Sequence, residues 1–186
     1  MGICTSCGRG TLEPKITSKP FLVIKEMVTD AEIKAESVFV EGSVNKWGYQ
    51  EHTTNYYLAK EMSMTGIQMN TLCLTNLYMH IPNKGKKTKE AKESAQGCLD
   101  YSISQVVKLA EGKKVILLMG AEAIRTFTGY PASDVYGLAC TSDFLSKETI
   151  IIPAPNSDKL MMMPIGEMRL ALKSFKSQID LYKNGG

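Results

Sequence analysis

Two cysteines near the N-terminus have a spacing found in metal sites and in redox pairs. The segment Cys4-Thr5-Ser6-Cys7 separates two thiols by two residues, which lets both bind one metal ion. The same spacing also occurs in thiol–disulfide redox pairs and by chance. A closed metal site needs two further ligands, so the pair alone leaves these three interpretations open.

Positive charge is concentrated in one short segment of an otherwise balanced chain. The 186 residues carry a formal net charge of +3, which neither requires nor excludes a nucleic-acid partner. Residues 84–89 read KGKKTK and form the most basic run. Such a run is typical of a solvated loop or of a segment that contacts a phosphate backbone.

Cysteine usage and hydropathy bear on the compartment. No stretch approaches the roughly 18 apolar residues of a membrane span, and the N-terminus has no hydrophobic signal region. We therefore expect an intracellular, cytoplasmic protein without a membrane partner, in a compartment that keeps thiols reduced. The five cysteines are then expected to be metal ligands or buried small side chains rather than disulfides: Cys4, Cys7, Cys73, Cys98 and Cys140.

Short apolar runs alternate with helical patterns along the chain. Strands are predicted at 21–24, 69–78, 114–119 and 149–152, and helices at 55–64, 88–109, 121–127 and 167–182. Residues 1–19 are interpreted as an arm, and residues 42–55 as a polar loop. This order predicts one α/β domain over 1–186, a three-layer sandwich with a mostly parallel four-stranded sheet. Ligands of such sheets bind beyond the carboxyl ends of the strands.

Five segments at or near these strand ends share an order and spacing with the motifs of one enzyme family. They are IKEMV at 24–28, VFVEG at 38–42, LTNLYMH at 74–80, VILLMGAEA at 115–123 and PAPNSDKL at 153–160. In this arrangement the chain resembles the iron–sulfur class of uracil-DNA glycosylases. Glu26, Phe39 and Asn76 match family residues, whereas the glycines and proline around the glutamate are absent. The family's histidine is also absent, and Asn156 stands in its place, or Pro155 after a shift of one residue.

The resemblance implies a uracil-DNA glycosylase-like fold and the excision of uracil or a modified pyrimidine from DNA. Phe39 would stack on the base, Asn76 would read its edge, and Glu26 would position water or stabilise the sugar cation. Asn156 would donate a hydrogen bond to the departing base but carries no positive charge. The residues expected to contact DNA are Lys84, Lys86, Lys87, Lys89, Ser157 and Lys159.

The same resemblance supplies two partners for the cysteine pair. The third and fourth ligand positions of the family fall on His80 and Cys98 in this chain. Together with Cys4 and Cys7 they make a Cys3His set, which suits structural zinc and is also compatible with an iron–sulfur cluster (4Fe-4S). Cys73 is a competing ligand that we expect to be buried in its strand instead. The centre would fix the N-terminal arm to the loop 81–87 and to the helix that follows.

Two functions of different classes remain open at this point. The first is a DNA glycosylase, favoured by Glu26. The second is a catalytically inactive relative that binds DNA or a replication or repair protein, favoured by the missing histidine. The pocket residues also have plain structural interpretations, with Phe39 in the core, Asn76 in a turn and Glu26 on the surface.

Overall fold

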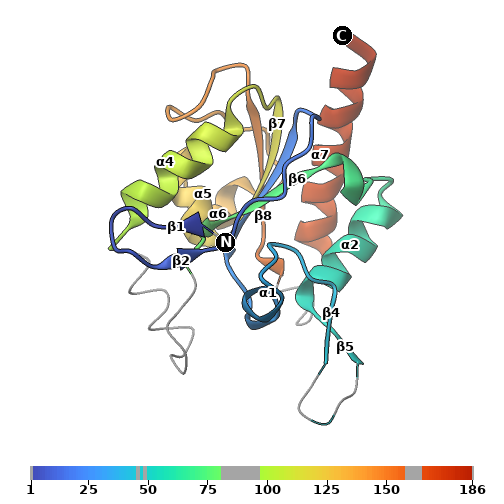
Figure 1. The fold of residues 1–186 in the computed structure, drawn as a ribbon. Coiled ribbons are helices and arrows are strands. Elements are labelled where there is room, and N and C mark those ends of the chain that lie inside the picture. The colour runs from blue at the N-terminus through green and yellow to red at the C-terminus, as the bar shows by residue number, and fades with distance from the viewer. Residues whose placement is uncertain (1, 45–46, 48–49, 81–96, 158–164, 186) are drawn as a thin grey trace.

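Four parallel strands form the central sheet of the computed structural model, which describes residues 2–44, 47, 50–80, 97–157 and 165–185 (Figure 1). The strands are β3 (Phe21–Met27), β6 (Cys73–Tyr78), β7 (Val115–Met119) and β8 (Ile150–Ala154), in the order β6-β3-β7-β8. All three pairings are parallel. Apolar runs of this length suit strands that are covered on both faces, and the α/β prediction is confirmed.

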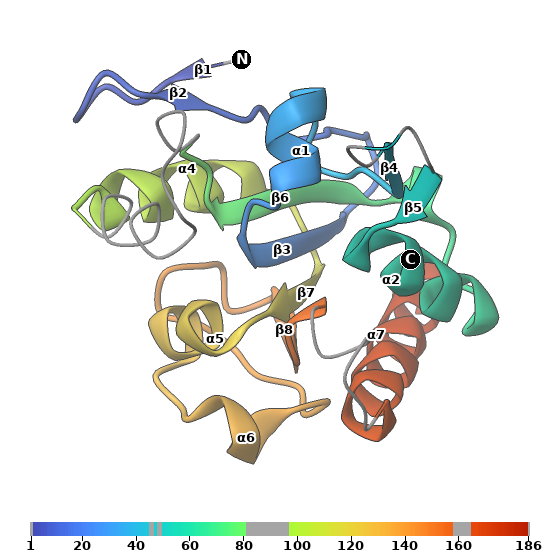
Figure 2. The same cartoon turned by 90° about the horizontal axis from the view of Figure 1, so that it is seen from below.

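Helices cover both faces of the sheet, so the fold has three layers. Side chains of β3 alternate between two hydrophobic clusters, with Phe21 and Val23 in one and Leu22 and Ile24 in the other. The first cluster includes residues of α2 (Thr54–Met64) and α7 (Gly166–Gly185), and the second those of α4 (Leu99–Ala110) and α5 (Ala121–Thr128). Figure 2 shows α4 and α5 apart from α2 and α7.

The predicted helices agree with the structure to within a few residues wherever the structure describes them. Of the helix predicted over 88–109, residues 88–96 are not described and residues 97–98 form a turn, so α4 begins at Leu99. None of the helices in the described part of the chain is long and apolar enough to cross a bilayer.

The strand predicted over 69–78 is wrong in its first part. Residues Met69–Thr71 form a 3-10 helix, η1, and β6 begins only at Cys73. The Thr71 hydroxyl donates to the carbonyl oxygen of Gln68 at 2.7 Å, which closes the turn locally. Threonine hydroxyls can offer the backbone this alternative to a sheet ladder.

Several short elements were not predicted. The expected N-terminal arm contains a hairpin of β1 (Gly2–Ile3) and β2 (Gly10–Thr11), and the expected loop 42–55 contains one of β4 (Gly42–Val44) and β5 (Gln50–His52). Helix α1 (Asp30–Ala35) and the one-turn helix α6 (Ala132–Val135) were also missed. Helix α1 had a readable signal, because Thr29 and Glu32 form a capping box at its start.

An ion pair joins the two helices on one face of the sheet. Glu61 of α2 accepts hydrogen bonds from Arg169 of α7, with its Oε2 at 2.8 Å from Nε and its Oε1 at 3.0 Å from Nη2. Hydrogen bonding to the guanidinium lowers the pKa of Glu61 below its ordinary value, although burial acts in the opposite direction. Because the folded state holds the carboxylate form, this pair contributes stability above the ordinary carboxyl pKa.

We expect Arg169→Gln to flatten the acid dependence of stability. In the native protein the contribution of Glu61 is lost as pH falls from the ordinary carboxyl value of 4.5 through the lowered value in the folded state. Urea unfolding at pH 7 and at successive steps below pH 4.5 measures this loss. Lys176→Gln is the matched control, since it removes a half-buried pair with Asp180 within α7. Identical acid slopes for the native protein and Arg169→Gln would contradict the prediction.

Candidate functional site

Four side chains from separate parts of the chain meet beside the N-terminal hairpin. One ligand atom from each of Cys4, Cys7, His80 and Cys98 lies within 4.8 Å of the others. Cys7 is exposed and the other three residues are buried. These are the four residues that the sequence predicted as a metal-binding set, and their arrangement is close enough to bind a metal ion.

Backbone hydrogen bonds shape the loop that carries the two N-terminal thiols. The N–H of Cys4 donates to the carbonyl oxygen of Arg9 at 2.8 Å, and the N–H of Gly8 donates to that of Cys4 at 2.8 Å. Gly8 has φ +71°, a left-handed conformation that favours glycine. The loop therefore turns tightly around the thiols, as metal-binding cysteine pairs require.

The other two ligands come from the end of β6 and the start of α4. Thr11 of β2 pairs with His80 in an isolated antiparallel bridge, and the N–H of Leu12 donates to the carbonyl oxygen of Met79 at 3.0 Å. Cys98 is the N-cap residue of α4. Backbone bonds thus attach the hairpin to the end of β6 and bring Cys4, Cys7 and His80 to the same place.

Burial shifts the pKa values of the three buried residues of this group. Burial, with hydrogen bonds to Cys7 and Cys4, raises the pKa of Cys98 to about 11. Burial also raises the pKa of Cys4, but hydrogen bonds from the backbone of Cys7 and Ser6 outweigh it, and the pKa is lowered overall. Burial lowers the pKa of His80, and the nearby charge of Arg9 adds to the effect.

His80 provides a direct test of whether the site fits a metal. Both ring nitrogens are buried, and neither has a hydrogen-bond partner among the described residues. An unpaired buried polar atom costs about 1–3 kcal/mol, so native proteins usually provide it with a partner. A neutral imidazole with an available nitrogen lone pair is the form that ligates a metal ion. The orphaned ring therefore fits a metal bound between it and the three thiols.

A second group of polar residues lies at the carboxyl end of the sheet, beginning with Glu26 of β3. Its Oε2 accepts a hydrogen bond from the N–H of Glu122 at 2.9 Å, in the first turn of α5. Gly120, with φ +104°, precedes this helix, and a Cβ at that position would lie 2.5 Å from the Glu26 side chain. Glycine thus allows the carboxylate to approach the positive end of α5, which favours an anion.

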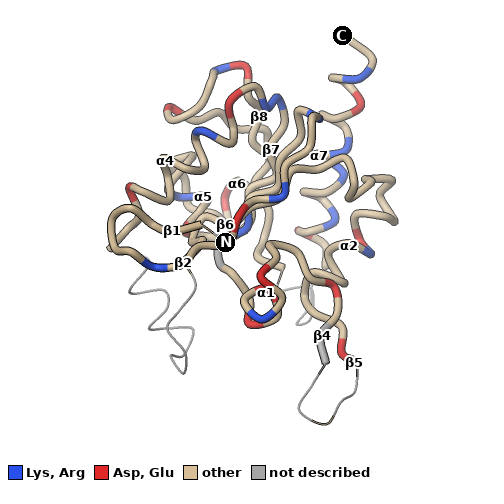
Figure 3. Tube along the Cα trace, in the orientation of Figure 1, with Lys and Arg blue, Asp and Glu red and all other residues tan. Residues whose placement is uncertain are grey.

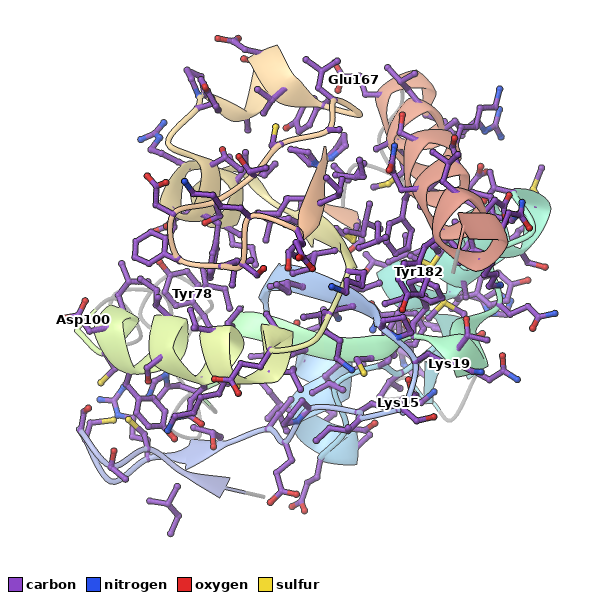
Figure 4. The ribbon with its side chains drawn as sticks, turned by 90° about the horizontal axis from the view of Figure 1, so that it is seen from above. Lys15, Lys19, Tyr78, Asp100, Glu167 and Tyr182 are labelled. Atoms are coloured by element: carbon purple, nitrogen blue, oxygen red, sulfur yellow. The ribbon has the colours of Figure 1, made fainter. Side chains whose placement is uncertain are left out.

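Glu26 is largely buried but borders a surface pocket. The pocket has a volume of about 470 Å³ and is lined by Glu26, Ala121, Glu122, Arg125 and Thr126. Glu122, which also lines the pocket, accepts a hydrogen bond at Oε1 from the hydroxyl of Tyr78 at 2.6 Å, and Figure 4 shows the Tyr78 side chain in the α4–α5 layer. Burial, with the hydrogen bond to Glu122, raises the pKa of Tyr78 above its ordinary value, so the phenol remains a donor.

Asn76 lies on β6, the strand next to β3. It pairs in register with Lys25 and is fully buried. Neither its side-chain oxygen nor its side-chain nitrogen has a hydrogen-bond partner in the described part of the chain. Phe39 is partly buried against the core, and its ring centroid is 5.6 Å from Nζ of Lys25. Asn76 and Phe39 therefore both neighbour Lys25.

The predicted pocket residues share one edge of the sheet but approach it from two faces. Glu26 points toward α5, whereas Lys25, the preceding residue, points toward α1 and α2. Asn156 and Ser157 follow β8, and Ser157 is buried. The predicted DNA contacts Lys84, Lys86, Lys87, Lys89 and Lys159 lie outside the described residues. The described Lys and Arg residues are spread over several helices and loops (Figure 3).

The buried network around Lys25 was not predicted from the sequence. Its ammonium forms an ion pair with Glu32 and donates to Oδ1 of Asn55 at 3.0 Å. Nδ2 of Asn55 donates to Oε1 of Glu32 at 2.9 Å, and the N–H of Thr29 donates to Oε2 of Glu32 at 2.8 Å. The only signal in the sequence was the charged pair that follows the apolar run FLVI at 21–24.

A search of protein-family models and of curated proteins finds no match to this chain.

Proposed function

We propose that this protein is a DNA glycosylase with a uracil-DNA glycosylase-like fold, which removes uracil or a related pyrimidine from DNA. The observation that carries the proposal is Asn76, a fully buried amide whose oxygen and nitrogen both lack a partner among the described residues. It lies at the carboxyl end of a parallel strand, where ligands of such sheets bind.

A buried amide of this kind has a donor and an acceptor side by side. Leaving both unpaired costs free energy, and a bound group with a complementary acceptor and donor recovers it. The edge of a pyrimidine base has that pattern, and an enzyme that acts on a base takes it out of the helical stack to read it. Phe39, close to the same point of the sheet, provides an aromatic surface for the base.

Glu26 supports the chemical half of the proposal. Cleavage of the bond between a sugar and its base leaves positive charge on the sugar, and a nearby carboxylate stabilises that charge or positions the attacking water. Glu26 is held at the N-terminal end of α5 and borders a pocket open to solvent. Its carboxylate is therefore available at the edge of the sheet that carries Asn76.

The test is release of uracil from a single-stranded or double-stranded oligonucleotide, followed as alkali-labile abasic sites. We expect release by the native protein and a loss of roughly 10²-fold or more in Asn76→Ala, comparable to removal of one preorganised donor elsewhere. Asn70→Ala is the matched control, because Asn70 is exposed in η1. Absence of release from any pyrimidine lesion by the native protein would exclude the enzymatic function.

The second candidate function is an inactive relative that binds DNA or a repair protein. The observation in its favour is Asn156, a neutral amide at the place where the family has a histidine. DNA binding without base release by well-folded protein would select this function over the first.

The basic run gives a separate prediction about DNA binding. We expect the triple change of Lys84, Lys86 and Lys87 to glutamine to weaken binding by a similar factor for all sequences. Each lost phosphate contact also lowers the slope of log affinity against log salt by roughly 0.9. A salt titration with a fluorescent oligonucleotide measures both effects. A triple change at Lys60, Lys108 and Lys173 on three helices is the control, and an unchanged salt slope in the first variant would show that the run does not contact DNA.

We assign the metal centre a structural role, with a single zinc ion as its occupant. Two thiolates at about 2.3 Å from one ion are less than about 4.6 Å apart, close to the spacing in this site. The ligands of a four-iron cluster each bind a different iron, so their atoms lie farther apart. The limit of 4.8 Å for all four ligand atoms therefore favours one ion. Bound there, zinc would hold the hairpin against β6 and α4.

A further inference from the structure

Lys25 is a buried lysine, which is rare in protein interiors. It lies at the carboxyl end of a central strand, and Glu32 and Asn55, which bind its ammonium, are fully buried. A buried ion pair must overcome the loss of hydration of both charges, and apolar replacements are often as stable or more stable. Stability alone therefore gives a weak reason for a lysine at this position.

Its neighbours are the two residues that we assign to base binding. Lys25 pairs in register with Asn76 on the adjacent strand, and paired residues of parallel strands point to the same face. Its Nζ lies 5.6 Å from the centroid of the Phe39 ring. The ammonium of Lys25 thus lies near an aromatic ring, and an amide stands at the adjacent position of the next strand.

We propose that Lys25 binds the pyrimidine through a carbonyl oxygen and stabilises the negative charge that the base acquires as it leaves. The inference rests on the proposed glycosylase function and deepens it. In that reaction the bond between C1′ and the base nitrogen breaks, and its electron pair stays on the base. Water adds hydroxide to C1′ and gives up one proton, which neutralises the base. The charge on the departing ring spreads to its carbonyl oxygens, where a fixed cation acts on it.

This role would compensate for the histidine of the glycosylase family, which this chain replaces with Asn156. Asn156 carries no charge, so any positive charge beside the departing base would have to come from another residue. The ion pair with Glu32 fixes the position of the ammonium, as a preorganised electrostatic site requires. Because Lys25 donates and never accepts hydrogen bonds, it favours a base with carbonyl oxygens over one with an amino group. We therefore expect preference for uracil over cytosine.

The experiment compares Lys25→Met/Glu32→Gln with the native protein. The double change removes both charges, so that neither is left buried alone, and thermal unfolding and circular dichroism check its fold. Lys114→Met/Glu148→Gln is the control, because it removes an ion pair at the opposite end of the sheet. We expect the first variant to lose roughly 10²-fold in the single-turnover rate of uracil release, with DNA affinity within a few-fold. The control should keep the native rate.

A second measurement uses the free bases uracil and cytosine. Titration calorimetry with the native protein should show tighter binding of uracil, and the double variant should lose that difference. Bound uracil should also lose its proton at a lower pH than free uracil in the native protein, seen as the absorption shift of the anion, and not in the variant. A folded variant with native rate and native base preference overturns the role of Lys25 and leaves the glycosylase function intact. A native protein that neither releases nor binds uracil overturns both.

Discussion

Replacing Cys98 with serine is expected to release the metal and to destabilise the protein by at least about 3 kcal/mol. Structural zinc contributes apparent binding free energies of about 10 kcal/mol or more at neutral pH, and this becomes folding free energy wherever the unfolded chain binds the metal weakly. We set the lower limit well below that value because the hairpin also has backbone bonds to the chain around β6. Elemental analysis and urea unfolding, with and without a chelator, measure the two effects.

Cys140→Ser is the matched control for this change. Cys140 is a partly buried free thiol that is not a member of the ligand cluster. It should keep its metal content and stay close to native stability. One zinc per chain would agree with the assignment. Iron together with inorganic sulfide would instead mean that the same four residues hold an iron–sulfur cluster. Protein purified without oxygen or chelators that contains neither metal would refute the centre itself.

The second large effect is expected at the two residues assigned to the chemistry. Glu26→Gln should abolish uracil release, because the neutral amide cannot stabilise the positive charge that forms on the sugar. Asn156→His should raise the rate by up to about 10²-fold, since one added electrostatic contact to a developing anion is worth roughly that much. Single-turnover assays with a uracil-containing oligonucleotide measure both rates.

DNA affinity distinguishes a change in the rate of uracil release from damage to the fold. Neither change removes a lysine, so DNA affinity should stay within a few-fold of the native value in both variants. Rapid uracil release that is indifferent to Glu26→Gln would refute the role given to this carboxylate. A combination of Asn156→His with Lys25→Met/Glu32→Gln is also informative, because a new histidine should recover part of the rate that the lost lysine supplied.

The group of Cys4, Cys7, His80 and Cys98 shows how far a metal-binding set can be predicted from a sequence. Cys4 and Cys7 are close in sequence, so their proximity follows from the chain itself. His80 and Cys98 came from the order of motifs, and the structure brings all four together. Cys73 is buried in β6, as expected, where its thiol accepts a hydrogen bond from the N–H of Thr17 at 3.2 Å. The cysteine pair alone left its partners open, and the resemblance in motif order supplied the two distant residues.

The carboxyl edge shows where sequence reasoning fell short. Glu26 and Asn76 are at their expected strand ends, but the face each one occupies depends on the register between β3 and β6, which no single segment encodes. Lysine is rarely buried, so nothing in the sequence marked Lys25 as an interior residue. Its burial becomes favourable only when Glu32 and Asn55, from two other elements, arrive to pair with it.

The hairpin that carries Cys4 and Cys7 also has a consequence for folding kinetics. About half of the chain separates Cys4 from Cys98, so the complete site closes a very long loop. The entropy of that closure must be lost before the last ligand binds, which makes these contacts late in folding and slow to form. Interactions that form after the transition state mainly slow unfolding. Loss of the ion should therefore appear first as a shorter lifetime of the native state, with the refolding rate little changed.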